Sequence, residues 1–188
     1  MARQAQRVTR APEESKARIL DAAQITFGTS GYARSGVREI AEAAGVAPSL
    51  VMHYFGSKEA LFEQAFIRSV QMTAALSVAR EGFGKNALEL LSEGDADTVR
   101  AAAMLAQSIG DPTARTVAGA LMEEEVLAPI ADWLGDPHAR GRAQLVAMLA
   151  LGFTSLRMLV PSDPEAEEDR YVAAWMARTL QRLADGRD

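Results

Sequence analysis

The residue types that carry out catalysis or bind metals are scarce in this 188-residue sequence. Cysteine is absent and the histidines are His53 and His138, so we expect neither thiolate chemistry nor a structural zinc site. The acidic run from Glu123 to Glu125 cannot converge on one substrate, because consecutive residues of a helix fan out around its axis. Neither a glycine-rich phosphate loop nor a nucleophile elbow is present. We therefore predict no catalytic residue, no metal site and no cofactor.

His53 lies in the stretch APSLVMHYFGSKEAL, which runs from Ala47 to Leu61 and also contains Tyr54 and Lys58. The imidazole N–H, the phenol O–H and the ammonium group are all donors that suit phosphate oxygens. A stretch of this kind can belong to a core, to an active site or to a surface that contacts a partner. Which of these three alternatives applies depends on the secondary-structure elements that contain the stretch.

The charges are distributed unevenly along the chain, whose net charge is −5. Residues 1–58 contain eight Lys and Arg against five Asp and Glu, whereas residues 59–188 contain twelve against twenty. A basic head on an acidic body indicates a small nucleic-acid-binding module attached to a second domain. We therefore place a DNA-binding domain at residues 1–58 and a second domain at residues 59–188.

The positions of apolar residues and of Gly and Pro predict an all-α protein of about nine helices. The first helix is expected to begin near Pro12, and Ser57 is expected to cap the fourth. No apolar run reaches the roughly 18 residues of a membrane span, and no apolar segment typical of a signal peptide follows the basic N-terminus. These features predict a cytoplasmic protein with no membrane partner.

The segment VREIAEAAGVAPSLVMHYF has the spacing of two helices joined by a tight turn. Gly45 tolerates the left-handed conformation that such a turn requires, and Ala41 is small enough to let the second helix approach the first. The apolar residues that lock the pair are Ile40, Val46 and Val51. The pattern predicts a helix-turn-helix that binds DNA, although a generic corner between two helices has the same spacing.

The segment from Ile19 to Phe66 closely resembles the N-terminal domain of TetR-family transcriptional regulators. The shared residues are Ala22-Ala23, Phe27, Gly31-Tyr32, Val37-Arg38-Glu39-Ile40-Ala41, Gly45-Val46 and the motif His53-Tyr54-Phe55-x-Ser57-Lys58-Glu59-x-Leu61. The resemblance implies a three-helix DNA-binding domain joined by a long helix to an α-helical ligand-binding and dimerisation domain. It also implies a homodimer that binds an inverted-repeat operator in double-stranded DNA and responds to a small-molecule effector.

The resemblance further implies which residues contact DNA, with the helix that begins near Pro48 lying in the major groove. The implied DNA-binding residues are Val37, Arg38, Ala47, Pro48, Ser49, Met52, His53, Tyr54 and Lys58. His53, Tyr54 and Lys58 would bind phosphates. The base-reading positions depart from the usual family pattern, because only Ser49 among them carries a hydrogen-bonding side chain. Base readout would then rest on Ser49, on Arg38, and on apolar contacts of Pro48 and Met52 with thymine methyl groups.

The last two predicted helices carry apolar stripes that are candidates for a dimer interface. The candidate interface residues are Leu145, Leu149, Gly152, Leu156, Tyr171, Trp175 and Arg178. A dimer is needed because a palindromic site has two half-sites about 34 Å, or one DNA turn, apart. Each half-site is read by the recognition helix of one DNA-binding domain. The alternative is that these stripes pack within one subunit.

The middle helices are rich in Met and aromatic residues, which suit a pocket that accepts varied apolar shapes. The candidate effector-pocket residues are Phe66, Met72, Met104, Gln107, Met122, Phe153 and Arg157. The alternative for each apolar member is an ordinary core position. We favour a ligand-responsive repressor over a helical interaction module or an enzyme without sequence-specific DNA binding.

Overall fold

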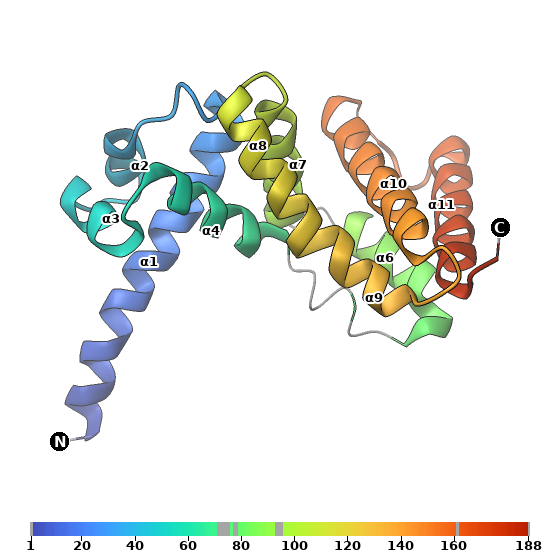
Figure 1. Cartoon of the computed structure of the whole chain (residues 1–188), viewed down its shortest axis with the longest axis horizontal. Coiled ribbons are helices and arrows are strands. Elements are labelled where there is room, and N and C mark those ends of the chain that lie inside the picture. The colour runs from blue at the N-terminus through green and yellow to red at the C-terminus, as the bar shows by residue number, and fades with distance from the viewer. Residues whose placement is uncertain (1, 71–75, 77–78, 93–95, 161, 188) are drawn as a thin grey trace. The chain divides into compact units, whose positions relative to one another are not determined.

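The computed structural model describes residues 2–70, 76, 79–92, 96–160 and 162–187, which contain helices and no strand (Figure 1). The α-helices are α1 (Ala2–Ser30), α2 (Val37–Ala43), α3 (Pro48–Phe55), α4 (Lys58–Val70), α6 (Phe83–Ser92), α7 (Ala96–Ser108), α8 (Pro112–Leu121), α9 (Ala128–Leu134), α10 (Ala139–Leu159) and α11 (Glu167–Asp185). A 3₁₀ turn, η1 (Arg80–Gly82), precedes α6, and a π-helix, η2 (Met122–Leu127), joins α8 to α9 without a break. Counted as continuous runs within the described ranges, the helices number nine, and the all-α prediction is confirmed.

The contacts divide the chain into two units. The first unit comprises Met1–Ser69 and Ala103–Ala118, and the second comprises Val70–Ala102 and Gly119–Asp188. The first unit therefore contains, besides residues 1–58, most of α4 and a segment of α7 and α8.

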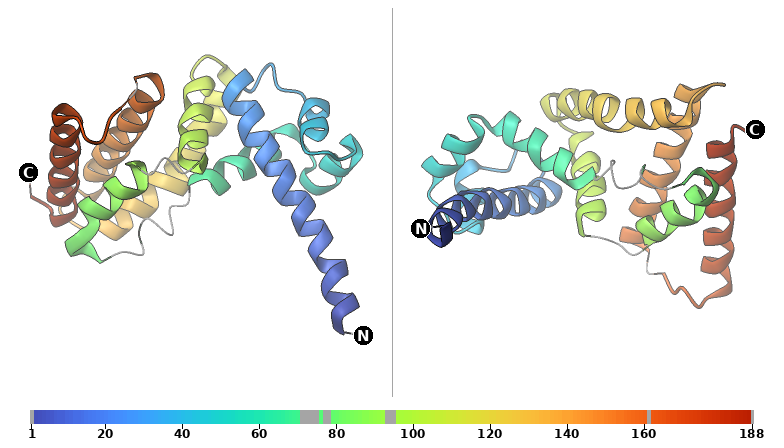
Figure 2. Two further views of the ribbon diagram at one scale, coloured as in Figure 1. Left: turned by 180° about the vertical axis from the view of Figure 1, so that it is seen from behind. Right: turned by 90° about the horizontal axis from the view of Figure 1, so that it is seen from below.

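The predicted start of the first helix near Pro12 is wrong. Helix α1 begins at Ala2 and contains Pro12 in its interior (Figure 2, in blue). A proline deprives a helix of one N–H donor, but its fixed φ of about −65° is compatible with helical backbone. Pro12 therefore permitted a helix start without requiring one.

The core of the first unit joins α1 to α2, α3 and α4. Phe27, Phe62 and Tyr32 form an aromatic cluster in which the Phe27 and Phe62 ring centroids lie 5.2 Å apart. The further large residues that are buried here are Ile19, Ile40, Val51, Phe55, Leu61 and Phe66. Buried Gln24 donates its side-chain amide to the Ala65 carbonyl at 3.0 Å, so α1 and α4 are also joined by a polar contact.

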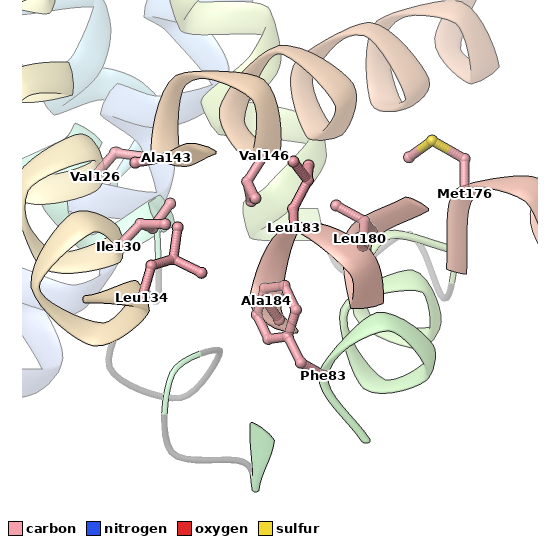
Figure 3. Packing of buried hydrophobic residues seen from close by; sticks show 10 residues of the cluster. All are labelled: Phe83, Val126, Ile130, Leu134, Ala143, Val146, Met176, Leu180, Leu183 and Ala184. Carbon is pink, nitrogen blue, oxygen red and sulfur yellow. The ribbon is translucent and has the colours of Figure 1, made fainter. Parts of the chain in front are cut away.

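The core of the second unit is formed by η2, α6, α9, α10 and α11 (Figure 3). The buried residues of this cluster are Phe83, Val126, Ile130, Leu134, Ala143, Val146, Met176, Leu180, Leu183 and Ala184. Two arginines add polar contacts to this unit. Arg142 is 4% exposed, and Arg80 donates its guanidinium N–H groups to the Leu134 carbonyl at 3.1 Å and the Ala184 carbonyl at 3.0 Å. These carbonyls end α9 and α11, where the helix dipole favours a positive charge.

Helix α6 approaches α11 most closely at Gly84. A Cβ atom placed on Gly84 would lie 2.8 Å from the Gln181 nitrogen and would overlap the Ala177 carbonyl oxygen. Both obstacles are backbone atoms of α11, so a side chain cannot be accommodated unless one helix moves. The glycine also donates its N–H to Gln181 Oε1 at 3.1 Å.

We predict that Gly84→Ala lowers the free energy of unfolding by about 2 kcal/mol or more, because overpacking a fixed backbone contact forces the two helices apart. Urea denaturation at a fixed protomer concentration measures the change. Gly141→Ala is the matched control, since Gly141 lies on α10 and a Cβ atom added there would have no atom within 4 Å. Equal effects of the two substitutions would contradict the close approach.

Candidate nucleic-acid interface

The turn between α2 and α3 has the geometry that the sequence predicted. Gly45 has a φ of +66°, and the Val46 N–H donates to the Ala41 carbonyl at 2.9 Å. Helix α3 begins at Pro48, whose N-cap Ala47 is extended and supplies no side-chain cap. Proline at the first helical position partly offsets the missing cap. A backbone N–H at that position would have no acceptor within the helix, and proline has no N–H to leave unpaired.

Helix α3 is anchored by one face and presents the other. Val51 and Phe55 are 1% and 6% exposed and fix the helix against the core of the first unit. The exposed residues at its N-cap and on its outer face are Ala47, Pro48, Ser49, Met52 and His53. Met52 is 44% exposed, so its apolar side chain is available for contact with a partner.

The other predicted DNA-binding residues border this surface. Arg38 is exposed on α2, whereas Val37, Tyr54 and Lys58 are half-buried. The structure thus places all nine predicted residues on α2, α3, the N-cap of α3 and the first position of α4. Their contact with DNA stays a prediction.

Lys16 is a neighbour of this surface that the sequence did not indicate. Its ammonium nitrogen lies 5.4 Å from the centroid of the Tyr54 ring and 3.4 Å from Glu13 Oε1. Lys16 belongs to α1, so its proximity to α3 depends on how the helices pack. The helical spacing of α1 alone gave no signal for it.

The start of α4 is capped as predicted, since the Ala60 N–H donates to Ser57 Oγ at 3.0 Å. Beside this cap the Tyr32 hydroxyl donates to Glu59 Oε1 at 2.7 Å, and the Lys58 nitrogen lies 4.3 Å from the Tyr32 ring centroid. Burial, followed by the hydrogen bond to Glu59, raises the pKa of Tyr32 above its usual range. The same hydrogen bond lowers the pKa of Glu59. Tyr32 is therefore a donor and Glu59 an ionised acceptor at neutral pH.

Three of the predicted effector-pocket residues lie in the first unit. Phe66 and Met104 are fully buried, whereas Gln107 is exposed and donates to the Thr29 carbonyl at 3.5 Å. An open cavity of about 260 Å³ beside α1 and the end of α2 is lined by none of them.

Three other candidates lie in the second unit. Met122 and Phe153 pack against its core cluster, and the Arg157 guanidinium carbon lies 5.3 Å from the Phe153 ring centroid. The remaining candidate, Met72, lies outside the described residues. A shared pocket for these residues stays a prediction.

The predicted dimer residues lie on α10 and α11, and most are exposed in the single chain. Leu145, Leu156, Tyr171 and Trp175 are 45%, 60%, 68% and 44% exposed, respectively. Gly152 and Arg178 are also exposed, and Leu149 is half-buried against the core cluster.

No described helix has both the length and the hydropathy needed to cross a membrane. Within the described ranges, no three His, Asp or Glu side chains gather as metal ligands would.

A helix-turn-helix with an exposed second helix and bordering cations defines a class, the helix-turn-helix DNA-binding proteins. The family described as "Bacterial regulatory proteins, tetR family" matches residues 19–65, and "Tetracyclin repressor-like, C-terminal domain" matches residues 81–183. The chain belongs to the TetR family and is a DNA-binding transcriptional regulator. The resemblance predicted from residues 19–66 is confirmed.

Relatives and a solved structure agree with this membership. The HTH-type transcriptional regulator Rv1255c of Mycobacterium tuberculosis (strain ATCC 25618 / H37Rv) is 32% identical over 176 residues, which are 91% of this chain and 76% of that protein. The HTH-type transcriptional regulatory protein RaaS of the same strain is 58% identical over 45 residues, which are 24% of this chain and 21% of RaaS. The crystal structure of NalD, the secondary repressor of the MexAB-OprM multidrug efflux pump in Pseudomonas aeruginosa, shares the fold with a TM-score of 0.60. NalD is 19% identical, and the match covers 88% of this chain and 95% of NalD.

Proposed function

We propose that the protein is a homodimeric repressor that occupies an inverted-repeat operator and is released by a small, largely apolar effector. The observation that carries the DNA-binding part is the exposed outer face of α3 beside the half-buried Tyr54 and Lys58. Donors of this kind bind phosphates and fix the register of a helix that reads bases. We assign DNA binding to residues 1–58, and ligand binding and dimerisation to residues 59–188. These functional bounds differ from the compact units, the first of which also contains residues 59–69 and 103–118.

The base-reading surface combines few polar groups with an exposed apolar one. Ser49 Oγ and the Arg38 guanidinium supply the hydrogen bonds to base edges, and Met52 supplies apolar contact. In the major groove the apolar group that bases present is the thymine methyl. We therefore expect operator half-sites with thymines opposite Pro48 and Met52.

The test is binding of the purified protein to its own upstream intergenic DNA in a salt series. Specific retardation that weakens steeply as salt is added supports the repressor, since phosphate contacts release counterions. If no upstream or genomic fragment is enriched at any salt concentration, the repressor proposal fails.

We predict different outcomes for backbone-contacting and base-contacting residues. Tyr54→Phe and Lys58→Ala should weaken binding to all sequences alike, and loss of Lys58 should reduce the salt slope by about one. Ser49→Ala and Arg38→Ala should instead change which bases are tolerated, by about 1–3 kcal/mol at a contacted position. Selection from a randomised operator library measures both effects, and the reverse pattern would show that the roles are exchanged.

The dimer is supported by the concentration of exposed apolar side chains on two helices. Nine of the thirteen large hydrophobic side chains that are exposed in the described ranges lie between Leu145 and Trp175. Exposed apolar side chains concentrated on two helices that contact each other are typical of a protein–protein interface. Gly152 is exposed on α10 with no atom within 4 Å of its Cβ position, so it leaves room for a close helix contact.

We predict that Trp175→Glu converts the dimer to a monomer at micromolar protomer concentration, because it places a charge in a desolvated apolar interface. Sedimentation velocity measures the mass of the species. Ile109→Glu is the control, since Ile109 is 70% exposed but lies in the turn after α7 rather than on α10 or α11. Loss of dimer in both variants, or in neither, contradicts this interface.

The effector is supported by family membership and by the Met and Phe residues of the body. The apolar candidates are Phe66, Met104, Met122 and Phe153, together with Met72, which lies outside the described residues. Gln107 and Arg157 are the candidate polar anchors. The effector releases the protein from DNA if effector and DNA prefer different conformations of residues 59–188. Only a ligand that binds one conformation more tightly than the other shifts the equilibrium between them. Native mass spectrometry of the purified protein detects a small molecule that is carried through purification. A compound found in this way should release the operator fragment, and failure to do so excludes it as the effector.

A further inference from the structure

Lys58 is the first residue of α4, and its ammonium nitrogen lies 4.3 Å from the centroid of the Tyr32 ring. The ring is fixed from several sides. It stacks on Phe27 at 6.0 Å, meets Phe62 edge-on at 5.5 Å, and is 7% exposed as a whole residue. Its hydroxyl donates to Glu59 Oε1 at 2.7 Å, so the orientation of the ring is fixed at both ends.

This location is unfavourable for a lysine unless something offsets it. The N-terminus of a helix carries a partial positive charge, and a cation there is repelled by the helix dipole. A lysine side chain has four flexible methylene groups and can turn away into water. The electron-rich face of an aromatic ring attracts the ammonium and keeps it at the helix end.

The Lys58 ammonium lies over an aromatic ring, and this kind of partner affects how the ammonium can bind a phosphate. A carboxylate hydrogen-bonded to the ammonium would occupy some of its N–H donors. An aromatic face attracts the cation without accepting these hydrogen bonds, so the donors stay available to a phosphate oxygen. The adjacent Glu59 carboxylate attracts Lys58 electrostatically, and its Oε1 atom accepts from the Tyr32 hydroxyl.

We propose that Tyr32 is a positioning residue for DNA binding, which holds the Lys58 ammonium at the start of α4, where it binds a phosphate of the DNA backbone. The inference rests on the proposed function, because it assigns a means of orientation to the phosphate contact of Lys58. It concerns affinity for any duplex, since a phosphate contact carries no sequence information.

The experiment is a double-mutant cycle on the full-length protein, with binding to an operator duplex and to an unrelated duplex followed by fluorescence anisotropy in a salt series. Lys58→Met should weaken binding to both duplexes by about three- to tenfold and reduce the salt slope by about one. Tyr32→Leu removes the ring and should have the same two effects. It should add nothing in the Lys58→Met background, because the residue that it orients is already absent. Tyr32→Phe keeps the ring, and its salt slope should equal that of the wild type.

A second measurement does not depend on whether Tyr32→Leu folds. The sequence contains three lysines, Lys16, Lys58 and Lys85, so reductive ¹³C-methylation gives few NMR signals, and Lys58→Met assigns one of them. The Lys58 methyl signal should lie upfield of that of Lys85, whose side chain is 79% exposed, and should shift when either duplex is added. A Lys58 signal at the position of the Lys85 signal, or full additivity of Tyr32→Leu and Lys58→Met, overturns the inference while wild-type binding persists. If the wild-type protein binds neither duplex, the proposed function fails as well.

Discussion

Replacement of Arg142 by leucine is expected to lower the free energy of unfolding by about 3 kcal/mol or more. The guanidinium is buried and donates to the carbonyls of Pro137 at 2.8 Å, Leu183 at 2.6 Å and Leu134 at 3.3 Å, and also to that of Gly135. These carbonyls end α9 and α11 or lie between α9 and α10. The Leu134 carbonyl also accepts from Arg80, and the Leu183 carbonyl also accepts from the Gly186 N–H. Leucine fills part of the volume but leaves the carbonyls of Pro137 and Gly135 without the donor that Arg142 supplies, and each such loss costs about 1–3 kcal/mol.

Arg140→Leu is the matched control, since Arg140 lies on the same helix and pairs with Glu123 at the surface. Both side chains of that pair are about half-exposed, at 45% and 50%. Exposed ion pairs of this kind contribute about 0–1 kcal/mol. Urea denaturation at a fixed protomer concentration compares the two variants. If Arg142→Leu costs no more than Arg140→Leu, the buried guanidinium does not hold the second unit together.

Met52→Glu is expected to weaken binding to every duplex by at least about 100-fold, because it buries an unpaired carboxylate against the negatively charged DNA. Met52 is exposed on the outer face of α3 and does not belong to the core that contains Val51 and Phe55. The free energy of unfolding should therefore change by less than about 0.5 kcal/mol. Fluorescence anisotropy with an operator duplex and thermal unfolding of the same samples measure the two quantities.

Ile67→Glu provides the control for the added charge. Ile67 is 42% exposed, close to the value for Met52, but it lies near the end of α4 in the first unit. It should reduce affinity far less than Met52→Glu does. Binding that survives Met52→Glu would show that α3 does not lie in the groove.

Much of the first unit was predictable because its signals are local. The left-handed Gly45, the cap at Ser57 and the buried Phe27 and Phe55 all follow from residue types within one or two helical turns. The start of α1 could not be predicted in this way, because Pro12 is compatible with both a helix start and a helix interior.

The helices that carry the expected DNA-binding residues were predictable, whereas the contacts among these residues and their neighbours were not. The structure places the expected residues on α2, α3, the N-cap of α3 and α4, and their contact with DNA stays a prediction. Lys16 beside Tyr54, and Tyr32 between Lys58 and Glu59, were not indicated as contacts. Each joins α1, or the turn that follows it, to a helix much later in the chain.

The sequence by itself determined the all-helical fold class, the turn of the helix-turn-helix and the family, since these depend on residue types at fixed short spacings. The tertiary structure alone decided that Tyr32 meets Glu59, which is 27 residues away, and that Arg80 meets Ala184, which is 104 residues away. The physical reason is the separation along the sequence over which each kind of interaction acts. Helix propensity, capping and turn geometry act between residues up to about four positions apart. Contacts between distant side chains exist only after the helices have packed, and that packing depends on the whole buried surface at once.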